Sequence, residues 1–170
     1  MNATMKIKGI IAYKLIDSVG RVKQEGEIEN IVTDQGNKYY VDRLSDAGGS
    51  VAQIMVLGTG TAAVATANTW VGGYFSNNGT LAGTAGSVTV STNSGTANSL
   101  QYVGTFSAGY ATQDGITRVG ITNTLASADG NGTPNGTTTF FIAHGTVTPT
   151  VNKGAADSLV ITWNHIFTGS

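Results

Sequence analysis

Residues 5–32, MKIKGIIAYKLIDSVGRVKQEGEIENIV, contain two runs in which apolar and charged side chains alternate. In residues 5–16 the odd positions are mostly apolar, and lysines occupy even positions. An alternation of period two indicates a β-strand with one buried face. Residues 17–20 supply a turn, and residues 21–32 return with apolar side chains opposite a basic and acidic row. The stretch therefore predicts an antiparallel hairpin with one charged face.

A helical signal and further strand signals follow the hairpin. Thr33 and Asp34 can cap a helix over residues 35–44, in which Tyr40, Val41 and Leu44 would form one stripe and Gly36 is unfavourable. Short β-branched runs separated by Asn-Gly and Asp-Gly turns then continue to the end of the chain. We expect strands at residues 51–57, 70–75, 87–92, 99–106, 116–123, 138–143 and 158–167.

The composition agrees with a β-rich chain. Val and Ile total 27 residues against 7 Leu, and there are 25 Thr, side chains that fit a pleated sheet better than a helix. Many short strands with regular turn signals are typical of sandwiches and barrels. We predict a mainly β protein, an antiparallel β-sandwich of jelly-roll or immunoglobulin-like type with one short helix near residues 35–44, forming a single domain over residues 1–170.

Length and charge limit the class of partner. The chain has 170 residues, 40% of them hydrophobic, with a net charge of -1, a combination that predicts a folded domain. Nucleic acids and anionic membranes require a basic surplus, so we expect neither as a partner. The absence of cysteine excludes disulfides, thiolate catalysis and zinc-thiolate sites. No secretory signal or membrane-length apolar run is evident, so we expect synthesis in the cytoplasm.

Charged residues are concentrated at the start of the chain. Residues 1–46 hold 14 of the 19, whereas residues 47–113 contain none. A surface of Thr, Ser, Asn and Gly is less costly to desolvate than one that carries unpaired charges. A charged hairpin and helix (residues 1–46) beside a neutral body (residues 47–170) therefore favours a permanent assembly. The alternative is a mere compositional habit of bacterial secreted or phage proteins.

Two motifs resemble ligand-binding loops but are better explained as turns. Residues 58–63 match the GxGxxA pattern of a dinucleotide-binding loop, which also needs a parallel βαβ unit and an acidic residue about 20 positions later. No acidic residue follows until Asp114. Residues 129–135 alternate like the start of a calcium loop, yet Asp129 is the only carboxylate among them. A solvated turn is the preferred interpretation, and ion binding by the Asp129 loop is left open.

The two histidines lack the sequence neighbours of a catalytic site. His165 shares one face of the last expected strand with Trp163 and Phe167, which predicts a packed, hydrogen-bonded or rim side chain rather than a catalytic base. No cysteine, GxSxG serine or paired carboxylate lies near His144 or His165. We expect no catalytic, cofactor-binding or metal-binding residues, no cofactor and no enzymatic activity. Three Asn-Gly-Thr triplets that match the glycosylation pattern are interpreted as turns, at residues 78–80, 131–133 and 135–137.

Several segments, in order and spacing, resemble a family of tailed-bacteriophage virion proteins from about residue 30 to the end. They are NIVTDQG (residues 30–36), MVLGTGT (55–61), GITRVGITN (115–123), and NKG with DSLVITW (152–154 and 157–163). Arg118 stands where the resemblance leads us to expect an acidic residue. The resemblance implies a non-enzymatic β-sandwich component of a tail fibre, a tail tip or the capsid exterior.

Within that family, a compact neutral domain favours a capsid decoration protein, or cement protein, that binds the major capsid protein. Analogy with other cement proteins implies a homotrimer, and many modest contacts on a lattice would add avidity. A tail, tail-tip or fibre-base protein is the alternative, and either lies on the virion after synthesis in the host bacterial cytoplasm. We expect residues 1–32 to contact the shell, where exposed sheet edges can also accept a strand from a neighbour.

A carbohydrate-binding or adhesin module is the alternative from a different class of protein. Its stacking platforms would come from the aromatic side chains of Trp70, Tyr74, Tyr102 and Tyr110. The competing interpretation of these four aromatics is that they belong to the core or to an interface.

Overall fold

The structure is a computed structural model that describes residues 5–45, 54–61, 65–66, 76–77, 80–81, 98–122 and 141–169. The elements follow in the order β1 (Met5–Ile16), β2 (Val22–Val32), α1 (Asp34–Leu44), β3 (Ile54–Gly58), β4 (Ser76–Asn77), β5 (Thr80–Leu81), β6 (Ser99–Phe106), β7 (Gln113–Thr122), β8 (Phe141–Lys153) and β9 (Ser158–Gly169).

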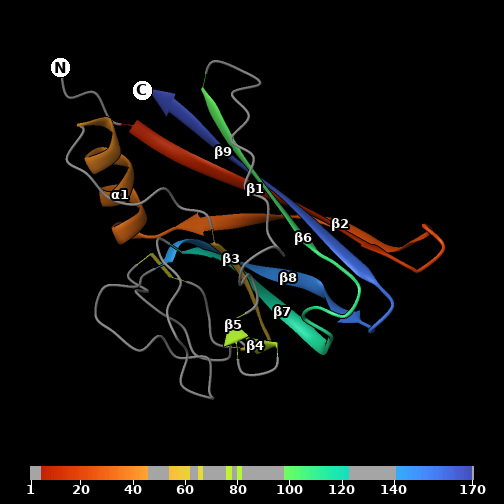
Figure 1. Ribbon diagram of the computed structural model, residues 1–170. Coiled ribbons are helices and arrows are strands. Elements are labelled where there is room, and N and C mark those ends of the chain that lie inside the picture. The colour runs from red at the N-terminus through yellow and green to blue at the C-terminus, as the bar shows by residue number, and fades with distance from the viewer. Residues whose placement is uncertain are drawn as a thin grey trace.

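Seven strands form one antiparallel sheet in the order β3-β7-β8-β2-β1-β9-β6, and β4 pairs with β5 separately. The large sheet curls into a half-barrel (Figure 1). The predicted mainly β fold with one short helix is confirmed. The predicted sandwich of two sheets is not confirmed, because β2 continues the ladder into β8 through Ile31 and Val32.

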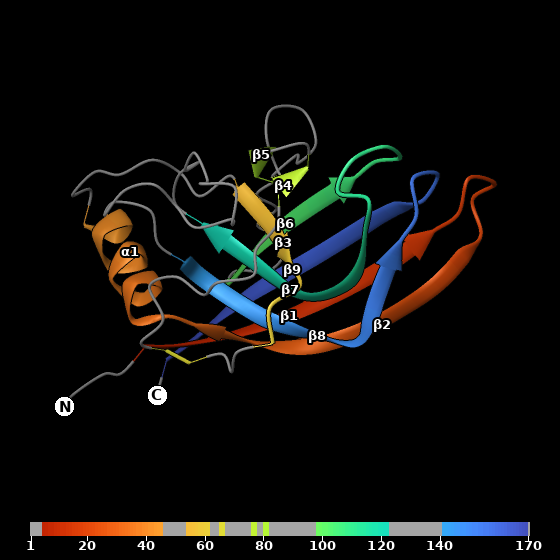
Figure 2. The same ribbon diagram turned by 90° about the horizontal axis from the view of Figure 1, so that it is seen from below.

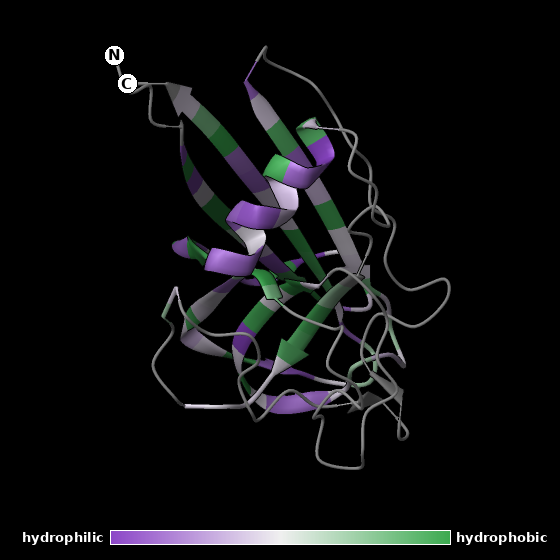
Figure 3. Ribbon diagram, turned by 90° about the vertical axis from the view of Figure 1, so that its left-hand side faces the viewer, coloured by the Kyte–Doolittle hydropathy of each residue, from purple (hydrophilic) through white to green (hydrophobic). Residues whose placement is uncertain are grey.

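The N-terminal hairpin lies in the middle of this sheet. β1 pairs with β2 on one side and with β9 over its whole length on the other. Ile11, Tyr13 and Leu15 are buried, whereas Lys8 and Lys14 are exposed, as the alternation in the sequence predicts. Figure 3 shows the same alternation as bands of hydropathy along the strands.

The helix α1 packs on the sheet through a face that shares only Tyr40 with the predicted stripe. Its buried residues are Gly36, Tyr39 and Tyr40, whereas Val41 and Leu44 of the predicted stripe are 54% and 76% exposed. The reason is a close approach at Gly36, where a Cβ atom would lie 1.9 Å from the Ile142 carbonyl oxygen of β8. Figure 3, seen from the α1 end, shows the helix in front of the strands.

The predicted start of α1 is confirmed. Thr33 is its N-cap, and the Thr33 hydroxyl accepts a hydrogen bond of 2.9 Å from the Gly36 N–H. The same hydroxyl donates to the Phe141 carbonyl of β8. Thr33 therefore caps the helix and ties its first turn to the sheet.

The strands agree with the sequence where the alternation is clean. β6 has the predicted bounds, and β3, β7 and β9 differ from theirs by a few residues. β8 is longer than predicted and continues to Lys153. Its ladder with β7 is irregular between the pairs Arg118–Thr146 and Ile116–Val151, and Pro149 lies within this irregular stretch. The strands expected at residues 70–75 and 87–92 lie outside the described residues.

The tight turns of the sheet gather at one end of the molecule. Figure 2 shows the β1–β2, β6–β7 and β8–β9 turns together at the end opposite α1. Side chains from different turns can therefore contact one another at this end. Within the described ranges, no helix has the length and apolarity needed to cross a membrane.

Candidate interaction surface

The outer face of the sheet brings charged β2 and β1 beside neutral β9 and β6. On β2 the exposed charged side chains are Lys23, Glu25, Glu27 and Glu29. The pairing with β1 sets Lys14 opposite Glu25 and Ala12 opposite Glu27. Acidic side chains thus form a row along β2, and lysines lie beside them on β1.

Two ion pairs cross from β1 to β2 on this face. Lys8 Nζ lies 2.9 Å from Glu29 Oε1, and Lys14 Nζ lies 3.3 Å from Glu25 Oε2. All four side chains are more than half exposed, so solvent screens these pairs and each contributes little stability. Glu27 has no ion pair within the described parts of the chain. An acidic excess therefore remains at the centre of the row.

The neighbouring part of the same face carries no charge. β9 contributes Val160, Thr162 and Asn164, which the pairing places beside Thr105, Val103 and Gln101 of β6. The Gln101 side-chain amide donates to Asn164 Oδ1 at 2.9 Å. A surface of hydroxyl, amide and small apolar groups can be desolvated at lower cost than one with free charges.

Most charged residues of the neutral body are inside the protein. Arg118, Lys153 and Asp157 are 2%, 1% and 5% exposed, whereas Asp114 is at the surface. The Arg118 guanidinium donates to the Gly60 carbonyl and to the Thr146 hydroxyl, each at 3.0 Å. These charges serve internal contacts, so they leave the outer surface even more neutral than the composition implies.

Lys153 and Asp157 organise the end of the molecule opposite α1. Lys153 Nζ donates to the Ser107 carbonyl at 3.0 Å, and burial lowers the pKa of this lysine. Asp157 Oδ2 accepts from Lys23 Nζ at 2.7 Å and from the Gly154 N–H at 2.9 Å. The hydrogen bond from Lys23 is the main reason why the pKa of Asp157 is lowered. The charged hairpin is thereby fixed to the β8–β9 turn.

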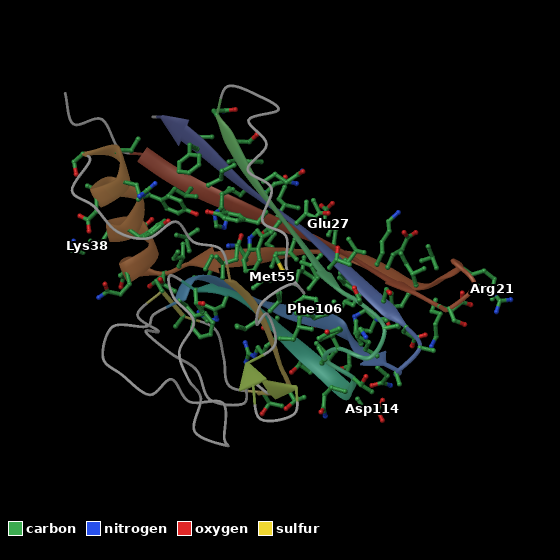
Figure 4. All side chains as sticks on the ribbon, in the orientation of Figure 1. Arg21, Glu27, Lys38, Met55, Phe106 and Asp114 are labelled. Carbon is green, nitrogen blue, oxygen red and sulfur yellow. The ribbon has the colours of Figure 1, made fainter. Side chains whose placement is uncertain are left out.

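The β1–β2 turn is also held by a carboxylate. Asp17 Oδ1 accepts from the Val19 and Arg21 N–H groups at 3.0 and 2.9 Å, and Oδ2 accepts from Arg21 Nε at 2.9 Å. These contacts lower the pKa of Asp17, chiefly through the Arg21 N–H. The turn, at the far end of β1 and β2 in Figure 4, presents Val19 with 70% of its surface exposed.

A buried polar cluster lies beneath α1. The Tyr40 hydroxyl contacts His165 Nδ1 and lies 3.2 Å from the Tyr102 hydroxyl, and Asn30 Nδ2 lies 3.5 Å from His165 Nε2. Burial lowers the pKa of His165 to about 3 and raises that of Tyr102 to about 12. Burial also raises the pKa of Tyr40. The cluster is therefore neutral at ordinary pH and connects α1 to β2, β6 and β9.

The second histidine is packed as well. His144 is fully buried, its ring stacks on Phe141 at a centroid distance of 5.4 Å, and Nε2 lies 3.3 Å from the Ala65 carbonyl oxygen. Burial lowers the pKa of His144. The prediction of packed or hydrogen-bonded surroundings is confirmed for His165, and His144 shares them.

The GxGxxA pattern is explained by a strand end. β3 pairs antiparallel with β7, so this part of the chain is not the parallel βαβ unit of a dinucleotide site. The Gly60 carbonyl accepts hydrogen bonds from the Thr117 hydroxyl at 2.7 Å and from Arg118. The burial of Arg118 and Lys153 is not predicted from the sequence, because the carbonyl groups that accept their hydrogen bonds come from other segments of the chain.

Of the remaining residues singled out in the sequence, the structure describes some and not others. Tyr102 is buried, which agrees with the interpretation that it belongs to the core and leaves it unavailable as a stacking platform, whereas Tyr110 is 52% exposed. Trp70, Tyr74, the Asp129 loop and the three Asn-Gly-Thr triplets fall wholly or partly outside the described residues. In the part of the chain that is described, no three His, Cys, Asp or Glu side chains are grouped as a metal site would need.

Comparisons with protein-family models, with curated proteins and with solved structures find no match.

Proposed function

We propose that the chain is a non-enzymatic structural protein of a tailed-phage virion, a decoration or cement protein that binds the major capsid protein and self-associates as a homotrimer. The observation that carries the proposal is the outer face of β2, β1, β9 and β6, where a charged row adjoins a neutral surface. Its location would be the virion surface, after synthesis in the host cytoplasm.

The neutral part of this face, on β9 and β6, suits a permanent contact with another protein. Around Thr162, hydroxyl and amide groups lose only modest hydration when a neighbour covers them, and they can form new hydrogen bonds. The burial of Arg118, Lys153 and Asp157 keeps unpaired charges away from this contact. The charged row beside it would set the register, because charge complementarity gives orientation more than affinity. Repetition on a lattice would supply the remaining avidity.

The proposal includes a sandwich-like arrangement of the two arms of the sheet. β2 joins β8 only at Ile31 and Val32, so the arm β2-β1-β9-β6 and the arm β3-β7-β8 can face each other. Contacts between the arms support this: Tyr13 Oη lies 3.5 Å from the Thr148 carbonyl oxygen, and Lys153 reaches Ser107.

The location is tested by counting copies in purified virions of the phage that encodes the chain, with quantitative mass spectrometry. Copies in proportion to the major capsid protein support a decoration protein. A number in proportion to a tail component would move the proposal to the tail, tip or fibre base. Absence from the particles would overturn it.

The surface is tested with one substitution and a matched control. Thr162→Lys places a charge at the centre of the neutral face, and Thr112→Lys places the same charge in the exposed β6–β7 turn. We expect Thr162→Lys to lose binding to particles and Thr112→Lys to retain it; equal binding would refute this face. Removal of residues 5–16 is not a useful test, because β1 is central to the sheet and the protein would unfold.

A further inference from the structure

We infer that the edge of β2 over residues 23–29 is an acceptor for an extended, basic segment of a partner protein, which adds to the sheet as a strand. The inference rests on the proposed assembly role and names the chemistry of the contact. The occupant is a segment with lysine or arginine at alternate positions.

The first observation is the pairing of β2. Its ladder with β1 continues as far as the turn, whereas its ladder with β8 is limited to Ile31 and Val32. Over residues 23–29, no strand of the described ranges pairs with the other edge of β2. An unpaired edge presents N–H and C=O groups that can hydrogen-bond to an added strand.

The second observation is the contact that keeps this edge apart from β8. Gln24 Nε2 donates to the Pro149 carbonyl at 3.1 Å and to the Thr150 carbonyl at 3.3 Å. The Gln24 side chain therefore connects β2 to β8 in a stretch where the two backbones do not pair. On the same inner face, Tyr13 covers Gly26, where a Cβ atom would lie 2.7 Å from Tyr13 Oη. β2 is thus held by the core, while its outer edge over residues 23–29 is not paired by any strand of the described ranges.

The third observation is the charge on the strand. Glu25, Glu27 and Glu29 are exposed on one face, and side chains directly opposite on a neighbouring strand interact. β1 already pairs Lys14 and Lys8 with two of these glutamates from its own side. A basic strand on the unpaired side would face the same row and would supply a cation for Glu27, which has no ion pair within the described ranges.

Charges on an edge strand can also serve to prevent pairing. That interpretation and ours differ in what they predict for a basic strand. A row of negative charges repels an acidic segment and disfavours a neutral one, because the carboxylates would lose hydration without gaining a partner. The same row attracts an extended basic segment. The sign of the probe peptide therefore decides between them.

The experiment uses the full chain and a synthetic, acetylated peptide in which lysine and threonine alternate. Two control peptides replace every lysine with glutamate, or methylate the backbone nitrogens on one edge of the lysine peptide. We expect the lysine peptide alone to bind, to slow hydrogen exchange of amides in residues 23–29, and to weaken as salt is added. Binding of the methylated peptide with equal affinity, or no binding by any peptide, would overturn the inference.

Matched variants locate the site. Glu27→Lys reverses the central charge of the row, and Asp114→Lys makes the same change on the β7 strand; Figure 4 labels both positions, well apart. We expect Glu27→Lys to weaken the lysine peptide by about tenfold or more, and Asp114→Lys to leave it unchanged. An equal loss in both variants would show a general charge effect and overturn the site. Peptide binding and virion copy number are independent measurements, so either proposal can fail alone.

Discussion

Lys23 Nζ of β2 lies 2.7 Å from Asp157 Oδ2 in the β8–β9 turn, so a residue of the charged hairpin is fixed to a buried carboxylate of the neutral body. The negative charge of Asp157 also acts on the buried Lys153: burial lowers the pKa of this lysine, and the charge of Asp157 raises it. Asp157 thus accepts hydrogen bonds from Lys23 and the Gly154 N–H, and it acts on Lys153 through its charge.

The first prediction is that Asp157→Asn destabilises the protein by about 1–3 kcal/mol, the usual cost of removing one partner from a buried polar contact. The variant leaves the buried Lys153 without its nearby anion. Urea denaturation measures the free energy of unfolding, with the exposed Asp114→Asn as the control that should remain within about 0.5 kcal/mol of the wild type. A similar small effect at both positions would show that the Lys23 pair contributes nothing.

The same carboxylate predicts an acid effect. The pKa of Asp157 is lowered from 3.8 in the folded protein, so its contribution is present above pH 3.8 and is lost as the pH falls through the folded pKa. The difference in unfolding free energy between the wild type and Asp157→Asn should therefore shrink below about pH 4. A difference that stays constant down to pH 2 would contradict a charged Asp157 as its cause.

A second pH effect comes from His165. Burial lowers its pKa from 6.5 to about 3, so the unfolded chain binds a proton between these values and the folded chain does not. Stability should fall by about 1.4 kcal/mol for each pH unit below 6.5 until the folded pKa is reached. His144, whose pKa is also lowered, acts in the same direction. Replacing His165 with Gln should reduce the slope of unfolding free energy against pH by about 1.4 kcal/mol per pH unit and leave the part due to His144. An unchanged slope would show that His165 is not its source.

The sequence predicts the parts of the fold that depend on neighbours along the chain. The alternation of residues 5–16 and the Thr33 cap are local signals, and both are confirmed. The curl of the sheet is not predictable in this way, because it depends on Ile31 pairing with His144 from a distant segment. The packing face of α1 depends on the distant Ile142, so the apolar stripe with Val41 and Leu44 was misleading.

The candidate surface shows the same division. The acidic positions on β2 are visible in the sequence because they alternate, and the neutrality of β6 follows from its composition. The burial of Arg118 and Lys153 is not visible, since it depends on carbonyls of Gly60 and Ser107 that other segments bring close.

Gly36 gives a prediction about how α1 is attached. Gly36→Ala improves helix propensity by about 1 kcal/mol, but its Cβ would overlap the Ile142 carbonyl of rigid backbone. We expect a net loss of about 1–3 kcal/mol in unfolding free energy, because the helix must move away from β8. The exposed Asn37→Ala receives the propensity gain without the clash and should be neutral or stabilising. A stabilised Gly36→Ala would mean that α1 does not pack this closely.

The buried cluster also predicts where its proton lies. The Asn30 amide nitrogen can only donate, so His165 Nε2 accepts from it and Nδ1 carries the proton, which it donates to the Tyr40 hydroxyl. The Tyr40 hydroxyl can then donate to Tyr102. The ¹⁵N chemical shifts of His165 should report the Nδ1–H tautomer at neutral pH. A proton on Nε2 would reverse the direction of the hydrogen bonds that run from His165 through Tyr40 to Tyr102.

Tyr40→Phe removes the hydroxyl that links His165 to Tyr102 and leaves His165 Nδ1 buried without its partner. We expect a loss of about 1–3 kcal/mol in unfolding free energy and faster hydrogen exchange in α1, since the hydroxyl connects the helix to β6 and β9. Tyr110→Phe, at a half-exposed tyrosine in the β6–β7 turn, is the matched control and should change neither quantity. If exchange in α1 is unaltered by Tyr40→Phe, the helix is held by packing at Gly36 and Tyr39 rather than by the polar cluster.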